Sequence, residues 1–338
     1  MQTNNLPVNH AMMDASYAQI FFEDFDRALD SPSTILDPHS DYKLWADSYF
    51  SLRTSPVARA AIRWHVKRLQ DLSQHHSALF PPVPSAETSA QRRQLDSYEL
   101  NYSFSVSSIQ KIRSSHPSLT APVIIKSALT LLNTHHTQHH YAVFANHEAA
   151  RTQFPFIPSS LAHLRFYEAT DVAGPTLSSV INLIEVRPQE TVLTFLSRMQ
   201  DDQTSLTRYA SAPWREVMRQ LGPETGALLP QVVRTQIFNW VPGMSATGSN
   251  PYANFKVLNT SSRPEVGLMV AAGMGGDDGR TVFLQVKGDG FEGQELVRFA
   301  EELEAVVKWI VEERNWEEPV GGFSEAFAKE GQKANENL

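Results

Sequence analysis

The chain contains no cysteine, and this absence excludes several kinds of chemistry at once. Disulfide bonds, thiolate metal sites and a cysteine nucleophile are all ruled out, and a cysteine-free chain suits a reducing compartment. Long apolar runs are also missing, because no stretch of the sequence approaches the roughly 20 residues of a membrane span. The opening residues, MQTNNLPVN, lack the basic and apolar regions of a secretory signal. The sequence therefore predicts a cytoplasmic protein.

Positive charge is scarce as well. The 338 residues include 29 Lys and Arg against 37 Asp and Glu, which gives a formal net charge of −8. This balance argues against a protein that tracks nucleic-acid phosphates or lies on an anionic membrane, because both need a surplus of positive charge. Hydrophobic residues make up 41% of the chain. We therefore expect a sizeable core, built as one large domain or two lobes.

Hydrophobic periodicity divides the chain into interleaved helices and strands. Spacings of three and four between apolar residues, with start and stop signals, predict helices at 14–30, 42–50, 56–72, 107–114, 121–132, 190–208 and 292–313. Alternating or short apolar runs predict strands at 98–106, 141–145, 180–186, 232–238, 266–272 and 281–286. The last two strands flank the glycine-rich sequence GMGGDDG and form a hairpin. The order of elements indicates an α/β (α+β) fold, and we expect these strands to share one mixed sheet.

A change of composition marks the predicted boundary between two lobes. Residues 77–97 begin with a cluster of prolines and continue into a Ser-, Glu- and Gln-rich stretch, which is typical of an exposed linker. We therefore divide the chain into residues 1–93, residues 94–322, which carry the predicted sheet, and a polar tail at residues 323–338.

The sharpest local feature is the sequence VNHAMMDA at residues 8–15. A short strand is expected to end near Val8, His10 follows at once, and Asp14 begins a helix. Histidine titrates near neutral pH, so at such a turn it can accept or donate protons, and a nearby acid can orient it. Taken alone, the pattern HxxxD favours a simple turn histidine, His10, followed by a helix cap, Asp14.

Six further segments follow this motif along the chain. They are YKLW at 42–45, RWHVKRL at 63–69, the predicted helix–helix–strand run at 107–145, VAGPT at 172–176 with the strand to residue 187, YASAPW at 209–214 and QIFNW at 236–240. Together with residues 9–14 they resemble, in the same order, the motifs of nonribosomal peptide synthetase condensation domains of the chloramphenicol acetyltransferase-like superfamily. The resemblance is strongest to the type found in fungal secondary metabolism.

The resemblance implies a two-lobe sandwich with His10 in the middle of a cleft. It further implies an acyltransferase that forms an amide or ester bond from a donor held as a phosphopantetheine or coenzyme A thioester, with no bound cofactor and no metal. In the family the histidine equivalent to His10 is catalytic, and the resemblance assigns His10 and Asp14 together as the catalytic residues of the motif. The implied partner is an acyl or peptidyl carrier protein or a small-molecule thioester, with no nucleic acid and no membrane. The resemblance also assigns substrate contacts and a structural arginine: Asn9, Ser178, Asn239 and Trp240, and Arg151.

The motif also departs from the family pattern. Asn9 stands where the family has a first histidine, Ala15 stands where it has glycine, and nine residues precede His10 where family members carry most of an N-terminal lobe. The resemblance therefore predicts a complete C-terminal lobe and an N-terminally truncated, partial first lobe. In such a chain Asp14 would lack the arginine that contacts it, and the aromatic helix at 14–30 would have one flank open. We expect this chain to self-associate or to need a partner that covers the flank.

Three functions remain open at this point. The first is a condensation-type acyltransferase, and the second is a coenzyme-A-dependent O- or N-acyltransferase, which shares the bare HxxxD signature. The third is a non-catalytic remnant of a condensation domain that binds a carrier protein or acts as an accessory protein. The presence of His10 and Asp14 favours the two acyltransferase functions. The short first lobe favours the non-catalytic remnant.

Two other segments contain residues that could carry chemistry. The cluster HHTQHH at 135–140 has metal-ligand spacing but no acid, and we expect surface histidines there rather than a metal site. The segment 146–148 follows a predicted strand and, with Arg151, could face the cleft.

Overall fold

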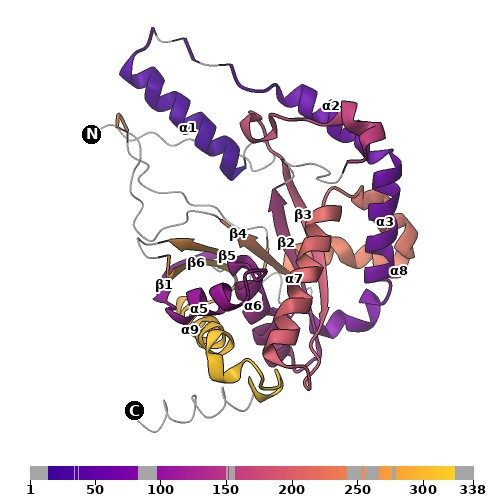
Figure 1. Ribbon diagram of the computed structural model, residues 1–338, viewed down its shortest axis with the longest axis vertical. Helices are drawn as coiled ribbons and strands as arrows, with labels where there is room; N and C mark the ends of the chain where they lie inside the picture. The colour runs from indigo at the N-terminus through magenta and orange to yellow at the C-terminus, as the bar shows by residue number, and fades with distance from the viewer. Residues whose placement is uncertain are drawn as a thin grey trace.

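The computed structural model describes residues 14–33, 35–36, 38–82, 97–149, 151, 157–241, 253–255, 266–275 and 279–323. Figure 1 shows their arrangement: a sheet with helices on both of its faces, and two helices, α1 and α2, at one end of the molecule. None of the helices within these residues is long and apolar enough to span a membrane.

Six strands form one mixed sheet in the order β1-β6-β5-β4-β2-β3. Strand β4 runs parallel to β2 and to β5, and the other neighbours are antiparallel. All six strands correspond to those predicted from the sequence, so the expectation of one mixed sheet in an α/β fold is confirmed. The strands are β1 (Ser97–Ser105), β2 (Tyr141–Ala149), β3 (Leu177–Glu185), β4 (Gln236–Trp240), β5 (Leu268–Gly275) and β6 (Thr281–Asp289).

One face of the sheet carries the largest apolar cluster. Alternate residues of the strands, such as Phe144, Phe238 and Leu284, point into it, because successive side chains of a strand point to opposite faces. Four helices cover this face, and each buries the apolar stripe that its sequence predicts. They are α5 (Ser108–Ser115), α6 (Ala121–Thr137), α7 (Val192–Tyr209) and α9 (Gly293–Val311).

The opposite face of β2, β3 and β4 is covered by a second cluster. Val143, Ala145 and Ile237 point into it and meet helices α3 (Pro56–Leu69) and α8 (Trp214–Thr235). The 3₁₀ segment η1 (Leu72–Ala78) joins them, and Leu79 beside it bridges to Val143. Residues that precede the predicted boundary at 93 therefore pack directly on the sheet.

Helix α8 was missed by the sequence reading, which also began the strand β4 four residues too early, at 232. The helix is interrupted at Gly222, whose φ of 80° is left-handed, and Pro223 begins the second segment. Pro230 follows within that segment. These residues break the apolar periodicity on which the prediction depended.

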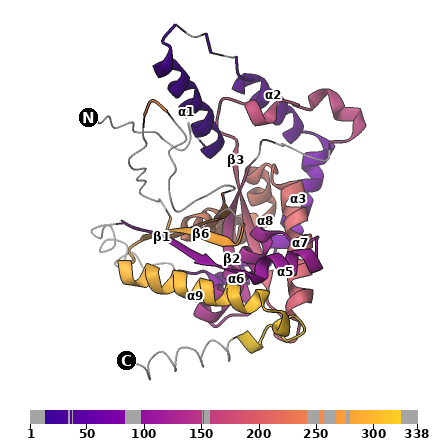
Figure 2. The same cartoon turned by 60° about the vertical axis from the view of Figure 1, so that its left-hand side comes forward.

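Helices α1 (Ala15–Asp30) and α2 (Tyr42–Arg53) stand apart from the sheet, as Figures 1 and 2 both show. Helix α1 makes only isolated contacts with the other described helices and strands. Phe255 covers the rings of Phe22 and Phe25 on one side, yet Phe25 remains 43% exposed and Leu29 45% exposed. The expected open flank of this helix is therefore present among the described residues.

Candidate functional site: the anchored aspartate of the HxxxD motif

Asp14 ends the motif and begins α1, and its carboxylate is almost completely buried, with 7% exposure. One oxygen, Oδ1, accepts from the backbone N–H of Tyr17 at 2.8 Å and from the Arg151 guanidinium at 3.0 Å. The other oxygen, Oδ2, accepts from the backbone N–H of Thr176 at 2.8 Å and from the Thr176 hydroxyl at 3.1 Å. The carboxylate thus caps its own helix and at the same time ties it to two distant segments.

Those two segments come from neighbouring strand ends. Arg151 follows the end of β2, Thr176 precedes the start of β3, and Ala149 pairs with Leu177 in the antiparallel register. The strand pairing therefore brings both donors to one place, although they are 25 residues apart in sequence. We call Asp14, Arg151 and Thr176 the anchor cluster.

The guanidinium of Arg151 is buried, and its two terminal nitrogens also donate to backbone carbonyls. It donates to Val172 O at 2.8 Å, to Ala169 O at 3.2 Å and to Gly174 O at 3.2 Å. It therefore fixes the segment that leads into β3 while it holds the carboxylate of Asp14. The expectation that Asp14 lacks an arginine partner is wrong, because Arg151 supplies that partner from within the chain.

The electrostatics of the anchor cluster favour the ionised carboxylate. Burial opposes ionisation of Asp14, but the hydrogen bonds from Tyr17 and Thr176 and the charge of Arg151 outweigh it, so the pKa of Asp14 lies below its usual value. A carboxylate held in this way is a fixed support and is not poised to exchange protons near neutral pH.

Helix α2 packs against the segment that Arg151 fixes. The rings of Tyr42, Trp45 and Tyr49 stack along the helix, with centroids 5.7 and 5.0 Å apart, and Trp45 packs on Val172. Gly174 approaches Tyr42 so closely that a Cβ atom at this position would lie 2.3 Å from the ring. The glycine of the VAGPT segment is thus required by this contact.

A second polar link joins α1 to the same segment. His39 lies between Asp24 of α1, at 2.6 Å, and Asp171, at 3.0 Å. Hydrogen bonds to these two carboxylates raise the pKa of His39, with the bond to Asp171 contributing most. Neither His39 nor Thr176 was predicted as a site residue. Asp171 lies 132 residues from His39, and Asp14 lies 162 residues from Thr176, so no local pattern reveals these contacts.

The other predicted site residues that the structure describes form no hydrogen bond with the anchor cluster. His10 and Asn9 lie outside the described residues. The buried hydroxyl of Ser178 donates to Ala210 O at 2.9 Å. Asn239 and Trp240 follow each other in β4, so they point to opposite faces of the sheet, and Trp240 packs against the helix-covered core.

Asn146 and Glu148 point to the face of the sheet opposite Asn239. There they belong to a chain of hydrogen-bonded polar side chains beside α6 and α7. Lys126 donates to Gln203, Gln203 donates to Glu148, and both distances are 2.7 Å. Asn146 donates to Glu148 at 2.5 Å and accepts from Asn182 at 2.7 Å. Burial lowers the pKa of Lys126 to about 8. The neighbour between them, His147, points to the opposite face and pairs in register with Asn239.

The histidines at 135–140 make contacts of their own. His136 stacks on Phe80, with centroids 4.6 Å apart, and lies 2.9 Å from Glu302. The Nδ1 atom of His139 accepts from the backbone N–H of Tyr141 at 3.1 Å. Within the described residues no three His, Asp or Glu side chains are grouped as a metal site would need.

Comparison with known proteins places this geometry in a fold class. No family model matches the chain, and no curated protein matches it. Solved structures do match over nearly its whole length, and they include condensation domains, so the chain has the fold of these domains.

Two of these structures show how similar the fold is. The first condensation domain of the calcium-dependent antibiotic synthetase, in complex with a substrate analogue, has a TM-score of 0.68 at 12% identity and covers 93% of this chain. The starter condensation domain of rhizomide synthetase, as a mutant in complex with C8-CoA, has a TM-score of 0.61 at 12% identity and covers 92%. The chain spans 67% and 66% of these two structures, and 63% to 65% of others.

Proposed function

We propose that the chain is a condensation-domain-like acyltransferase that forms an amide or ester bond in nonribosomal peptide, and hence secondary-metabolite, biosynthesis. The observation that carries the proposal is the anchored Asp14, four residues after His10, in a chain with the condensation-domain fold. Because Asp14 is held by Arg151 and Thr176, the motif is attached at its last residue to segments that adjoin β2 and β3. A cytoplasmic location stays a prediction of the composition.

In the proposed reaction His10 accepts the proton of an amine or hydroxyl acceptor. The acceptor's nitrogen or oxygen bonds to the thioester carbonyl carbon, the carbon–sulfur bond breaks, and the proton passes to the departing thiolate. A positioned general base of this kind contributes about 10²–10⁴-fold to the rate. Asp14 and Arg151 do not touch the reacting atoms in this scheme, and their role is to hold the turn.

The proposed donor is an acyl group on phosphopantetheine or coenzyme A, delivered by a carrier protein or as a small molecule. Support comes from the neighbour that binds C8-CoA and the one that binds a substrate analogue. Among the expected substrate contacts, Asn239 is the best supported, because its side chain shares a sheet face and register with His147. Asn9 and Trp240 remain proposals, and the hydroxyl of Ser178 is engaged by Ala210.

The test is release of free thiol from octanoyl-coenzyme A in the presence of amine and hydroxyl acceptors. A thiol reagent reports it without background, because the chain has no cysteine. We expect His10→Ala to reduce turnover by about 10²–10⁴-fold. The matched control is His163→Ala, at an exposed histidine outside the anchor cluster, and it should leave turnover unchanged.

Turnover that His10→Ala leaves unchanged would contradict the catalytic role. Activity with coenzyme A donors alone, and none with carrier-bound donors, would favour the coenzyme-A-dependent acyltransferase. If no donor reacts but a loaded carrier protein binds, the chain is the non-catalytic carrier-binding or accessory protein.

The open flank of α1 leads us to propose that this surface is covered in solution by a second copy or by a partner. Phe25 and Leu29 are exposed on a helix that makes little contact with the described part of the chain. Exposed apolar surface of this kind favours association. Light scattering after size-exclusion chromatography should show species larger than 38 kDa, whereas a monodisperse monomer at high concentration would contradict the proposal.

A further inference from the structure

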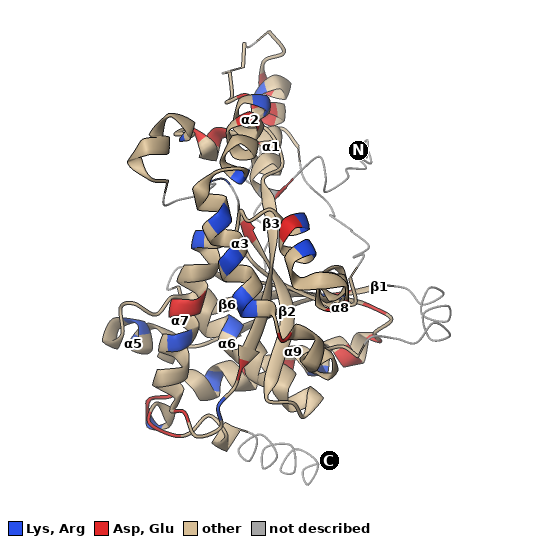
Figure 3. Cartoon of the chain, turned by 90° about the vertical axis from the view of Figure 1, so that its right-hand side faces the viewer, with Lys and Arg blue, Asp and Glu red and all other residues tan. Residues whose placement is uncertain are grey.

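The outer face of α3 carries positive charge that the fold does not use. The helix contains four basic residues and no acidic residue. Three of them, Arg59, Arg63 and Lys67, follow each other at intervals of four, and all three are exposed. Residues four apart share a helix face, so they form one stripe about 12 Å long. Figure 3 shows the basic residues of α3 along the face that it presents to the viewer.

The stripe is not neutralised by its surroundings. Among the described residues, Arg63 and Lys67 form no ion pair, and Arg59 reaches only the backbone oxygen of Thr54, at 3.4 Å. The fourth basic residue, Arg68, turns toward α7 instead and pairs with Asp202 at 2.9 Å. A row of unpaired cations on a chain with a net charge of −8 is a local feature and does not reflect a general excess.

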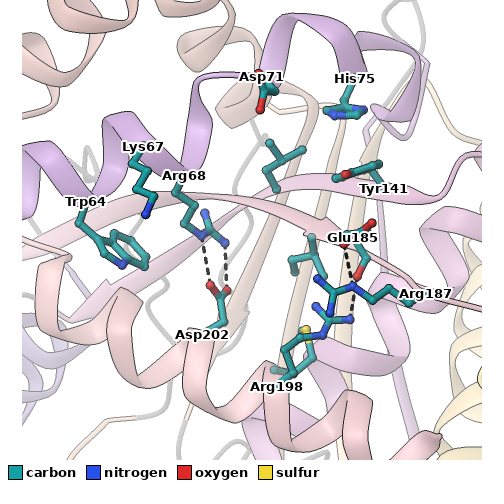
Figure 4. Close-up of a pocket in the computed structure, with 13 residues that line it drawn as sticks. Trp64, Lys67, Arg68, Asp71, His75, Tyr141, Glu185, Arg187, Arg198 and Asp202 are labelled. Carbon is teal, nitrogen blue, oxygen red and sulfur yellow. Dashed lines mark hydrogen bonds and ion pairs between the residues drawn. The ribbon is translucent and has the colours of Figure 1, made fainter. Parts of the chain in front are cut away.

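A groove of about 530 Å³ opens where the stripe ends (Figure 4). Lys67 and Trp64 lie on its α3 side, and Tyr141 and Leu183 line it from β2 and β3. The ring of Trp64 stacks under the Arg68 guanidinium at 5.4 Å, and Tyr141 stacks on His75 at 3.7 Å. The groove therefore combines the rings of Trp64 and Tyr141 and the aliphatic side chain of Leu183 with charged side chains of both signs. The cations are Lys67, Arg68, Arg187 and Arg198, and the carboxylates are Asp71, Glu185 and Asp202.

The groove follows the free edge of β3, the last strand of the sheet. Unpaired strand edges invite a further strand. Here Arg68 donates to Ile181 O at 2.6 Å and Arg198 donates to Glu185 O at 2.8 Å, so two of the edge carbonyls are occupied. An added strand would have to displace both arginines. The groove is therefore shaped to receive side chains and not an extended backbone.

We propose that the stripe and the groove form a docking surface for an acidic amphipathic helix of a partner protein. A helix with carboxylates at every fourth position matches the spacing of Arg59, Arg63 and Lys67. An apolar side chain at the end of its acidic row then enters the groove beside Trp64 and Leu183. Three cations on an acidic chain are too few to track a nucleic-acid backbone, which favours a protein partner.

This surface is separate from the anchor cluster. The groove lies at the Tyr141 and Glu185 ends of β2 and β3, whereas Arg151 and Thr176 lie at the opposite ends. Nine-residue strands place the two regions about 25 Å apart. Binding here does not depend on the proposed acyl transfer, and failure of one proposal leaves the other standing.

The test uses the full chain and a fluorescein-labelled helical peptide with Glu at three positions four residues apart, followed by one Leu. Fluorescence anisotropy at low salt measures the affinity. We expect the triple variant Arg59→Glu, Arg63→Glu and Lys67→Glu to weaken binding at least about tenfold. The control reverses three exposed cations elsewhere, at Lys111, Lys308 and Arg314, with the same change in charge, and should alter affinity by less than about twofold.

Replacing the peptide's Leu by Ser tests the groove without altering the protein, and it should also weaken binding. Equal losses in the stripe variant and the control variant would overturn the proposal, as would unchanged binding in the stripe variant. A DNA duplex that binds the stripe as tightly as the peptide would likewise overturn it. Melting temperatures of both triple variants establish that they are folded.

Discussion

Helices α1 and α7 are alike in length, with 16 and 18 residues, and both are amphipathic, yet they are held in different ways. Helix α7 buries Val192, Phe195 and Leu196 completely in the main apolar cluster. None of the described side chains of α1 is buried to that extent, and polar contacts at Asp14, Asp26 and His39 attach it to other segments. On its apolar side, its aromatic rings pack on Phe255 among the described residues outside the helix. One helix is part of the core, and the other is attached mainly by hydrogen bonds and charge.

The way in which α1 is attached also bears on the function proposed for the motif. Asp14 is both the cap of α1 and the last residue of the HxxxD motif, so the contacts that attach the helix also fix the end of the motif. An attachment made of directional contacts specifies orientation, whereas apolar packing of similar strength tolerates rearrangement. The predictions below separate these two kinds of attachment.

The largest effect is expected in the core. Phe195→Asp places a charge without a partner among the side chains of the main cluster, which should destabilise the protein by roughly 4 kcal/mol or more. The control, Thr204→Asp on the exposed side of the same helix, should be nearly neutral. Chemical denaturation measures both, and equal unfolding midpoints would show that α7 does not contribute to the core as described.

A smaller and more local effect is expected at the anchor. Asp14→Ala removes a helix cap and leaves the Arg151 charge buried without its carboxylate, a change worth about 3 kcal/mol. Asp41→Ala removes the corresponding cap of α2, which is exposed and accepts only from Lys43, and should cost about 1 kcal/mol or less. Similar losses in the two variants, measured by urea denaturation, would mean that Asp14 is merely a cap.

The smallest effect concerns His39. Its pKa is raised in the folded protein, so the protonated histidine stabilises the fold at pH values below about 6.5, and this contribution is lost as the pH rises through the folded pKa. His39 is partly exposed, so the contribution should be about 0.5–1 kcal/mol. His39→Gln should abolish the corresponding difference in stability between pH 5.5 and pH 8, and a difference that persists would point to other groups.

The sequence predicted the elements that have one apolar stripe or clear alternation, which include all six strands and helices α6, α7 and α9. It could not predict α8, because Gly222 and Pro223 interrupt its pattern. It identified Asp14 and Arg151 separately, since one lies in a motif and the other follows a strand. Their pairing depends on the antiparallel register of β2 and β3, which no local pattern encodes.

The groove beside α3 could likewise not be predicted from local sequence patterns. The spacing of Arg59, Arg63 and Lys67 is visible in the sequence. Their lack of ion pairs among the described residues and the wall formed by Leu183 are properties of the folded chain. Long-range contacts decide which charged residues are used by the fold and which remain available for binding.

A polar anchor at Asp14, and not a shared core, holds α1 on the sheet. Amide hydrogen exchange of the Asp14→Ala variant, read separately for α1 and β2, tests this most directly. The anchor predicts that α1 loses its protection while β2 keeps the protection of the parent protein, with Asp41→Ala leaving both unchanged. Unaltered protection of α1, or an equal loss in α1 and β2, would contradict the claim.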